Sequence, residues 1–236
     1  MSLGKIRRLL SLRSSKKYIE YLRKCGSSIG KETVFLSPVH TDFDTGRARY
    51  ISIADNCIIC SGVSIIAHDY SWKILEKSHS KVLPSGGMPI KIGNNVFVGV
   101  NSTILGNVEI GDNVIIAAGS VVCRSLPSNT VCAGNPAKVV KTLDDYYKKR
   151  EASVLADAIN NARYIYEKTG RAPTMEEMRN FIVLFMPRTE ENFRKYVYSY
   201  NCVGGDVNDY AEMIRMTEPL YPDLETFLRK EVIDRE

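Results

Sequence analysis

Aliphatic side chains recur at every sixth position through the middle of this 236-residue chain. The run reads Ile92, Val98, Ile104, Ile110, Ile116 and Val122. A strict period of six fits neither an α-helix, whose period is about 3.6, nor a plain strand, whose period is about 2. Asn or Gly stands three residues after each of the first five members, and both tolerate the left-handed dihedrals of a tight corner. The run therefore predicts a parallel β-helix, whose short strands must stack coil on coil to bury their apolar sides.

Three such strands would complete one coil, so residues 18 apart should lie above one another. The predicted pairs are Ile92 with Ile110, Val98 with Ile116, and Ser102 with Ser120. Phe97 and Ile115 are also 18 apart, but they fall at outward positions of the repeat. An exposed apolar ladder of this kind usually marks an interface, so we expect the coil to associate with copies of itself.

The repeat covers residues 29–141, and aliphatics are again in phase at Ile53, Ile59 and Ile65. From Ile65 to Ile92 the spacing is 27 residues, which is not a multiple of six, so residues 69–90 form an insertion. Loops held by a rigid solenoid are frequent places for binding and catalytic residues. We therefore expect the functional site where this insertion leaves the coil.

The sequences on both sides of the repeat predict helices. Residues 142–236 follow helical spacing, most clearly over 154–166, and Thr174 to Glu177 predicts a capping box that opens a further helix through Phe185. Residues 1–28 predict short amphipathic helices, and residues 1–24 hold eight basic side chains against one acidic one. The rest of the chain then carries −2 of the net charge of +5. The basic segment is either a solvated helix or a basic face that contacts anionic lipid headgroups or an anionic polymer.

The six cysteines show no disulfide-framework spacing and no secretory signal precedes them, so we expect reduced thiols in a cytoplasmic protein. Cys57 and Cys60 are separated by two residues, as in redox and zinc pairs. The repeat places Cys57 inward and Cys60 outward, and no second pair completes a tetrahedral site. We therefore expect packing cysteines and no metal centre.

The chain has three histidines, His40, His68 and His79. His68 ends the last regular strand before the insertion, where the rigid coil would hold its imidazole beside the loop. A general base must be positioned first, and histidine suits removing a proton from an alcohol near neutral pH. His68 is therefore the candidate base, and a structural or surface histidine is the alternative.

Four stretches resemble one known family: Ile92 to Gly99 (IGNNVFVG), Ile110 to Val114 (IGDNV), Ala118 to Ser120 (AGS) and Ala133 to Lys138 (AGNPAK). They are similar to the motifs of the hexapeptide-repeat acetyltransferases, which include galactoside, maltose and serine O-acetyltransferases. The resemblance implies a mainly β fold, a left-handed parallel β-helix with short N-terminal helices and a C-terminal α-helical region. It also implies acetyl-CoA as co-substrate.

The resemblance assigns the residues around the reacting groups. His68 falls where the family places the histidine that deprotonates the acceptor hydroxyl. The backbone amide that meets the thioester carbonyl falls on Val100, and the stacked contact one coil later falls on Ala118. The family's sugar-binding carboxylate has no clear counterpart, so Asp42 or Asp44 would stand in for it and a different acceptor is expected.

Further coenzyme A contacts depart from the galactoside enzyme. Cys123 stands where a side-chain hydroxyl is expected. Lys138 and Lys141 replace two phosphate-facing arginines, which keeps the charge but loses the planar guanidinium. Their spacing should let both ammonium groups reach one side of the segment that leaves the coil.

The implied activity is acetyl-CoA-dependent O-acetylation of a sugar hydroxyl in capsule or lipopolysaccharide biosynthesis, by direct transfer and without a metal. The family implies a homotrimer with active sites between subunits, and we expect no nucleic-acid partner.

Three alternatives stay open at this point. An N-acetyltransferase acting on a nucleotide-linked amino sugar would use the same residues. A γ-type carbonic anhydrase shares the fold but needs two of its zinc ligands closer together than His68 and His79, which are 11 apart. A non-catalytic scaffold would need neither His68 at the insertion nor the two lysines.

Overall fold

The computed structural model describes residues 10–199 and 206–233. The helical and basic predictions for residues 1–9, and Cys202, lie outside the described residues. The chain divides into two compact units, Met1–Tyr146 and Tyr147–Glu236, and each is described by itself.

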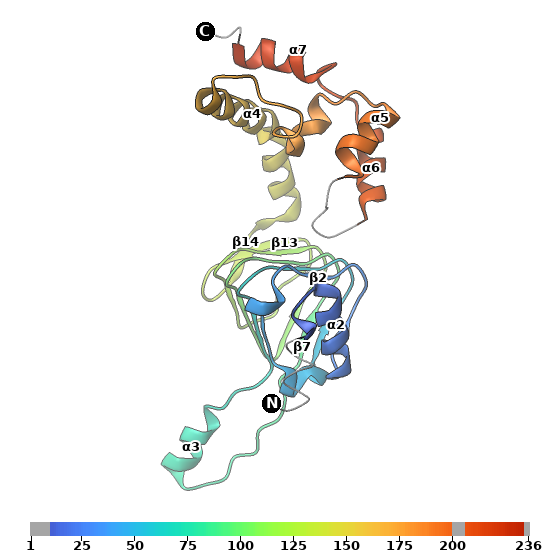
Figure 1. Cartoon of the computed structure of the whole chain (residues 1–236). Helices are drawn as coiled ribbons and strands as arrows, with labels where there is room; N and C mark the ends of the chain where they lie inside the picture. The colour runs from blue at the N-terminus through green and yellow to red at the C-terminus, as the bar shows by residue number, and fades with distance from the viewer. Residues whose placement is uncertain (1–9, 200–205, 234–236) are drawn as a thin grey trace. The chain divides into compact units, whose positions relative to one another are not determined.

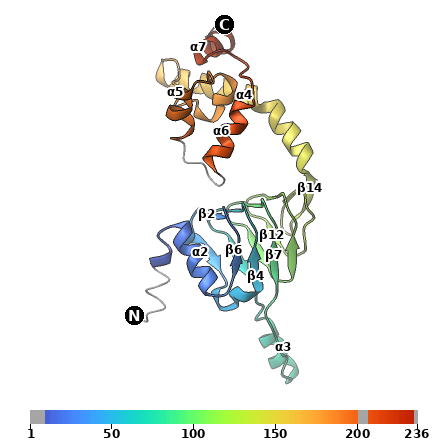
Figure 2. The ribbon, with the colours of Figure 1, turned by 90° about the vertical axis from the view of Figure 1, so that its right-hand side faces the viewer.

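The first unit is a coil of three parallel sheets, and the chain passes through sheets A, B and C in turn (Figures 1 and 2). Sheet A contains β1 (Ser28–Ile29), β4 (Ile51–Ile53), β7 (Ile90–Ile92) and β10 (Val108–Ile110). Sheet B contains β2 (Val34–Phe35), β5 (Ile58–Ile59), β8 (Phe97–Val98), β11 (Val114–Ile116) and β13 (Thr130–Ala133), followed by β14 (Lys138–Thr142), which is antiparallel to β13. Sheet C contains β3 (Asp42–Phe43), β6 (Ser64–Ile66), β9 (Thr103–Leu105) and β12 (Val121–Val122).

The register agrees with the six-residue repeat. Ile110 pairs with Ile92 in sheet A, and Ile116 pairs with Val98 in sheet B, which confirms two of the predicted stacks. The corners between strands use left-handed residues, as the repeat predicted. The asparagines with positive φ are Asn56, Asn95, Asn101, Asn107, Asn113 and Asn129. Stacking therefore buries a column of β-branched side chains along the inside of the coil.

One inward–outward prediction was wrong. Cys57 is fully buried as expected, but Cys60 is buried too, with 5% of its surface exposed. Cys60 directly follows the inward Ile59, and its N–H donates to the Val98 carbonyl of the next coil at 3.0 Å, so it lies against that coil. The equivalent residue one coil later is Gly99, where an added Cβ would lie 2.5 Å from the Ala118 nitrogen.

Short helices close the start of the coil. The helix α2 (Ser15–Lys24) begins at Ser14, whose hydroxyl accepts from the Lys17 N–H, and it buries Tyr18, Ile19 and Leu22 against the core. Arg23 ties its end to the coil, because its guanidinium donates to the Ile29 carbonyl at 2.5 and 3.0 Å. Two 3-10 helices, η1 (Pro38–His40) and η2 (Thr45–Tyr50), occupy the irregular first coil.

The insertion is an arm that stands clear of the coil in both views (Figures 1 and 2). It contains α3 (Trp72–His79), which has no buried residue. Its base is fixed by a bond from the Met88 N–H to the Ala67 carbonyl at 2.9 Å. Gly87 packs on the Tyr50 ring so closely that an added Cβ would lie 2.0 Å from it.

The second unit is helical. Its elements are α4 (Leu143–Thr169, which begins in the first unit), η3 (Arg179–Leu184), α5 (Glu190–Asn192), η4 (Phe193–Val197), α6 (Val207–Arg215), α7 (Leu224–Leu228) and η5 (Arg229–Ile233). The predicted capping box forms, with Thr174 and Glu177 exchanging backbone-to-side-chain bonds of 2.8 and 3.3 Å. It does not open the expected α-helix, because a turn follows and then the 3-10 helix η3. Two cores hold this unit, one around Phe185 and Phe227 and one around Phe193 and Ile214.

Close stacking at the corners gives a stability prediction. A Cβ added at Gly93 would lie 2.7 Å from the Gly111 carbonyl carbon of the next coil, so Gly93→Ala should destabilise the coil by about 1–3 kcal/mol. The matched control is Gly86→Ala in the arm, where an added Cβ meets nothing within 4 Å. Thermal unfolding followed by circular dichroism should show a lower midpoint for Gly93→Ala alone, and equal midpoints for both variants would contradict this account.

Candidate active site

A histidine and an aspartate from consecutive coils meet at the corner between sheets C and A. His68 follows β6, and Asp44 follows β3 in the coil beneath. The His68 Nδ1 atom lies 2.5 Å from the Asp44 Oδ2 atom. Their side chains are 30% and 9% exposed, so the carboxylate is nearly buried while the imidazole reaches solvent.

The Asp44 carboxylate is itself held in place. Its Oδ1 accepts from the Arg47 N–H at 3.1 Å, and its Oδ2 accepts from the Ala67 N–H at 3.3 Å. An ionised carboxylate only accepts, so it assigns the proton to Nδ1 of a neutral His68 and leaves the Nε2 lone pair free. No described residue bonds to Nε2. This arrangement can remove a proton from a bound hydroxyl or amine.

An aromatic ring lies against the same imidazole. The ring centroids of His68 and Tyr70 are 4.4 Å apart, with an angle of 39° between the planes. Sequence reasoning missed this contact, and it placed Asp44 at the acceptor rather than on His68. The available signal for Tyr70 was its position two residues after His68, at the start of the insertion.

Two backbone donors lie at another corner. Val100 and Ala118 follow β8 and β11, between sheets B and C, and the Gly119 N–H donates to the Val100 carbonyl at 2.8 Å. Val100 is 44% exposed. Neither the Val100 nor the Ala118 N–H donates to any residue that the structure describes. Stacked free N–H groups of this kind can bind a carbonyl oxygen or an amide.

Lys138 and Lys141 lie on the same face of β14 because a β-bulge interrupts its pairing with β13. Lys138 lies opposite Ala133 and Lys141 lies opposite Val131. Val131 and Ala133 point to the same side of β13, because they are two residues apart. The register shift between them lets residues three apart in β14 do the same. Among the described residues neither lysine has a carboxylate partner, so the pair can bind an anion.

The remaining predicted residues are not gathered in one place within the chain. Cys123 is exposed and follows β12, so it lies on the same corner as His68 rather than with Val100. Asp42 is exposed in β3, opposite Ser64. A single copy therefore separates the candidate base from the candidate donors for the thioester carbonyl.

The other histidines lie apart from this corner. His40 Nδ1 lies 2.7 Å from the Ser37 hydroxyl, and His79 ends the exposed helix α3. No group of three or more His, Cys, Asp and Glu side chains within residues 10–199 and 206–233 is placed to hold a metal ion.

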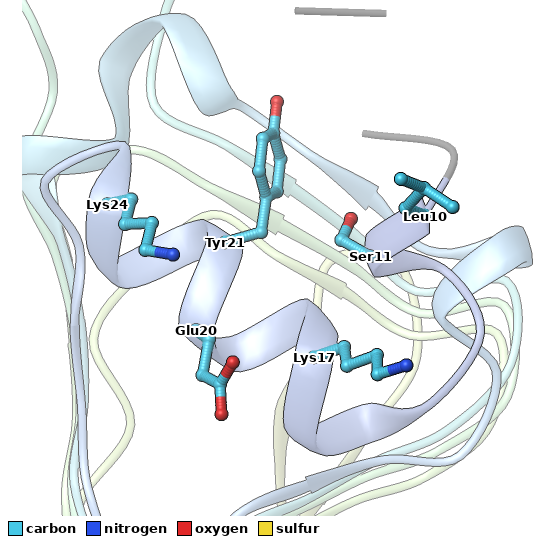
Figure 3. A pocket seen from close by; sticks show the side chains of 6 residues that line it. All are labelled: Leu10, Ser11, Lys17, Glu20, Tyr21 and Lys24. Carbon is cyan, nitrogen blue, oxygen red and sulfur yellow. The ribbon is translucent and has the colours of Figure 1, made fainter. Parts of the chain in front are cut away.

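Two of the hollows elsewhere on the first unit involve residues singled out above. One, of about 630 Å³, lies along α2 (Figure 3), and its lining residues are Leu10, Ser11, Lys17, Glu20, Tyr21 and Lys24. The other, of about 380 Å³, lies on the outer face of sheet B. Phe97 and Ile115 line it side by side, with Leu143 and Tyr146 beside them. The predicted outward ladder therefore forms, and Phe97 is 38% exposed.

No described helix is both long enough and apolar enough to cross a membrane.

Comparison with known proteins gives matches over the coil. The family model for bacterial transferase hexapeptide (six repeats) matches residues 89–124. Protein CapG of Staphylococcus aureus is 40% identical over 129 residues, which cover 54% of this chain and 73% of CapG. Galactoside O-acetyltransferase of Escherichia coli K12 is 37% identical over 116 residues, covering 44% of this chain and 53% of that protein. The chain thus spans about half the length of the galactoside enzyme.

A solved structure of galactoside acetyltransferase in complex with coenzyme A is also similar. It is 25% identical, covers 61% of this chain and 81% of its own, and gives a TM-score of 0.44.

Proposed function

The chain belongs to the hexapeptide-repeat acetyltransferases and is an acetyl-CoA-dependent acyltransferase, and we propose that it acetylates a hydroxyl group of a sugar. The observation that carries the proposal is the Asp44–His68 pair, which leaves Nε2 unbonded at an exposed corner. The name of the galactoside enzyme supports a sugar acceptor. We place the reaction in the assembly of a bacterial surface polysaccharide, a capsule or lipopolysaccharide.

In this mechanism His68 Nε2 removes the proton from the acceptor hydroxyl while Asp44 holds Nδ1–H. Asp44 thus orients the base rather than binding the sugar, and Asp42 stays the proposed acceptor contact. Bound acetyl-CoA supplies the acetyl group as an activated thioester, and the acceptor oxygen attacks its carbonyl carbon directly, so no acyl-enzyme forms. The Val100 N–H donates to the carbonyl oxygen as this oxygen gains charge under attack. The C–S bond breaks once the new C–O bond has formed, and His68 gives its proton to the departing thiolate.

The separation of the two corners supports assembly as a homotrimer. His68 lies between sheets C and A, whereas Val100 and Ala118 lie between sheets B and C. If His68 of one copy faces Val100 of the next, one complete site forms at each contact between copies. The exposed Phe97 ladder supplies apolar surface for such a contact. We also infer that the coil is left-handed, as in the family.

We further propose a cytoplasmic protein whose α2 touches an anionic membrane surface. Exposed Lys16, Lys17 and Lys24 project from α2, and Lys17 and Lys24 line the hollow of Figure 3 together with Glu20 and with Leu10, which is 46% exposed. A basic face beside an exposed leucine fits lipid headgroups.

Loss of the base should abolish most activity. His68→Ala should lower acetyl transfer by about 10² to 10⁴-fold, because general base catalysis supplies about that factor. Coenzyme A release measured with a thiol reagent and candidate sugars gives the rate. His79→Ala is the matched control and should stay active. Full activity of His68→Ala, with loss in His79→Ala, would overturn the assignment.

Loss of both lysines should weaken binding of acetyl-CoA alone. Charge-assisted contacts contribute about 1.5–3 kcal/mol each, so Lys138→Ala with Lys141→Ala should raise the acetyl-CoA KM by about tenfold or more. The acceptor KM should hardly change, because the acceptor lies beside His68. Ala at both Lys148 and Lys149, exposed in α4, removes the same charge and should leave both constants unchanged. An unchanged acetyl-CoA KM in the first double variant would leave these lysines without a role in binding.

Assembly should depend on the outward ladder. We expect a trimer at micromolar concentration by light scattering, and Phe97→Asp should yield monomers without activity, because each monomer lacks half a site. A fully active monomer would contradict the shared site.

Membrane contact should depend on charge. Sedimentation with phosphatidylglycerol-containing vesicles should fall for Lys17→Glu with Lys24→Glu, but not for the same change at Lys148 and Lys149. Equal binding of both double variants would refute this contact.

A further inference from the structure

Tyr70 is the first aromatic residue of the insertion arm, and it rests on the candidate base. Its ring lies 4.4 Å from that of His68, centroid to centroid, at 39°. Tyr70 nevertheless stays 59% exposed. Among the described residues, the imidazole of His68 is the only aromatic ring that it contacts. The contact does not belong to the apolar core of the coil.

The bond to Asp44 alone does not fix the imidazole. It holds the Nδ1 edge at 2.5 Å, but one hydrogen bond restrains the rotation of the ring about its Cβ–Cγ bond only in part. A flat group against one face of the ring restrains this rotation further. The face of a phenol ring also attracts a cation, so the same contact favours the imidazolium that forms when Nε2 takes a proton.

The arm places Tyr70 there. The returning end of the arm is tied to the coil beside His68: the Met88 N–H donates to the carbonyl of Ala67, the residue before His68, and Gly87 packs on the Tyr50 ring. Asp69, between His68 and Tyr70, accepts from the Ser71 N–H at 2.7 Å and from its hydroxyl at 2.9 Å, which closes a tight turn. These bonds lower the pKa of Asp69, so the carboxylate that accepts them stays ionised to a lower pH than an ordinary aspartate.

We propose that Tyr70 is a positioning residue, through which the insertion arm fixes the plane of the His68 imidazole and sets the rate of acetyl transfer. This inference rests on the proposed function, in which His68 is the base. It requires the ring of Tyr70 and not its hydroxyl, so phenylalanine should replace it.

The test combines a spectrum with kinetics, so that the stack and the reaction are measured separately. NMR spectra of protein labelled at its three histidines report the ring-current shift of the His68 resonances, which His68→Ala identifies. Tyr70→Ala should move these resonances and lower kcat by about three- to tenfold, the range expected for one aromatic contact. The acetyl-CoA KM should stay unchanged. Tyr70→Phe should keep both the resonances and kcat.

The control is Tyr164→Ala in the second unit, a tyrosine of similar exposure at 61%, which should change neither the spectrum nor kcat. If the His68 resonances did not move in Tyr70→Ala, the ring contact between Tyr70 and His68 would be contradicted. Moved resonances with an unchanged kcat would overturn the positioning role, and so would a Tyr70→Phe variant as slow as Tyr70→Ala. If His68→Ala were fully active, the proposed function would fail instead, whatever the spectrum of Tyr70→Ala.

Discussion

Every other feature of the first unit depends on coil-on-coil stacking of the inward β-branched side chains. One coil cannot bury Ile92 or Val98 by itself, because each side chain needs the equivalent residue above and below it. The corners that allow this stacking are held by an amide ladder, in which Asn95 donates to Asn113 at 2.8 Å and Asn113 donates to Asn129 at 2.9 Å. The same asparagines thus adopt the left-handed dihedrals and form the side-chain hydrogen bonds. Together these two features set the spacing between successive coils.

The regular part of this stack was readable from the sequence because its spacing is constant. Sheets A and B keep an 18-residue step between the third and fourth coils. The earlier coils do not: Ile53 pairs with Ile92, 39 residues on, because the arm intervenes. The helical character of the second unit could be predicted, because apolar residues recur at helical spacing along α4 up to Gly170. The element after Thr174 was not, because a capping box specifies where a helix starts but not that it continues.

In the candidate site, too, some residues could be predicted from the sequence and others could not. His68 could be identified from its position at the insertion, and the proposal that it acts as the base agrees with its free Nε2. Its partner could not be found, because an 18-residue step back from His68 reaches Tyr50, whereas the carboxylate beneath it is Asp44, 24 residues away. The 3-10 helix η2 adds the extra residues. The shared face of Lys138 and Lys141 was predicted, but the bulge that produces it was not, since residues three apart in an ordinary strand point to opposite faces.

These placements divide the proposed chemistry between the regular and the irregular parts of the fold. The free N–H groups of Val100 and Ala118 arise from the repeat itself, because each follows an inward aliphatic residue at the same corner. Any chain with this repeat offers them, so a thioester carbonyl can be bound by backbone alone. The base, its carboxylate and Tyr70 instead lie where the repeat is interrupted: Asp44 caps η2, His68 precedes the arm, and Tyr70 lies in it. Under the proposed function, binding of the thioester carbonyl would therefore follow from the stacking, whereas the choice of acceptor would follow from the interruptions, which can change without disturbing the stack.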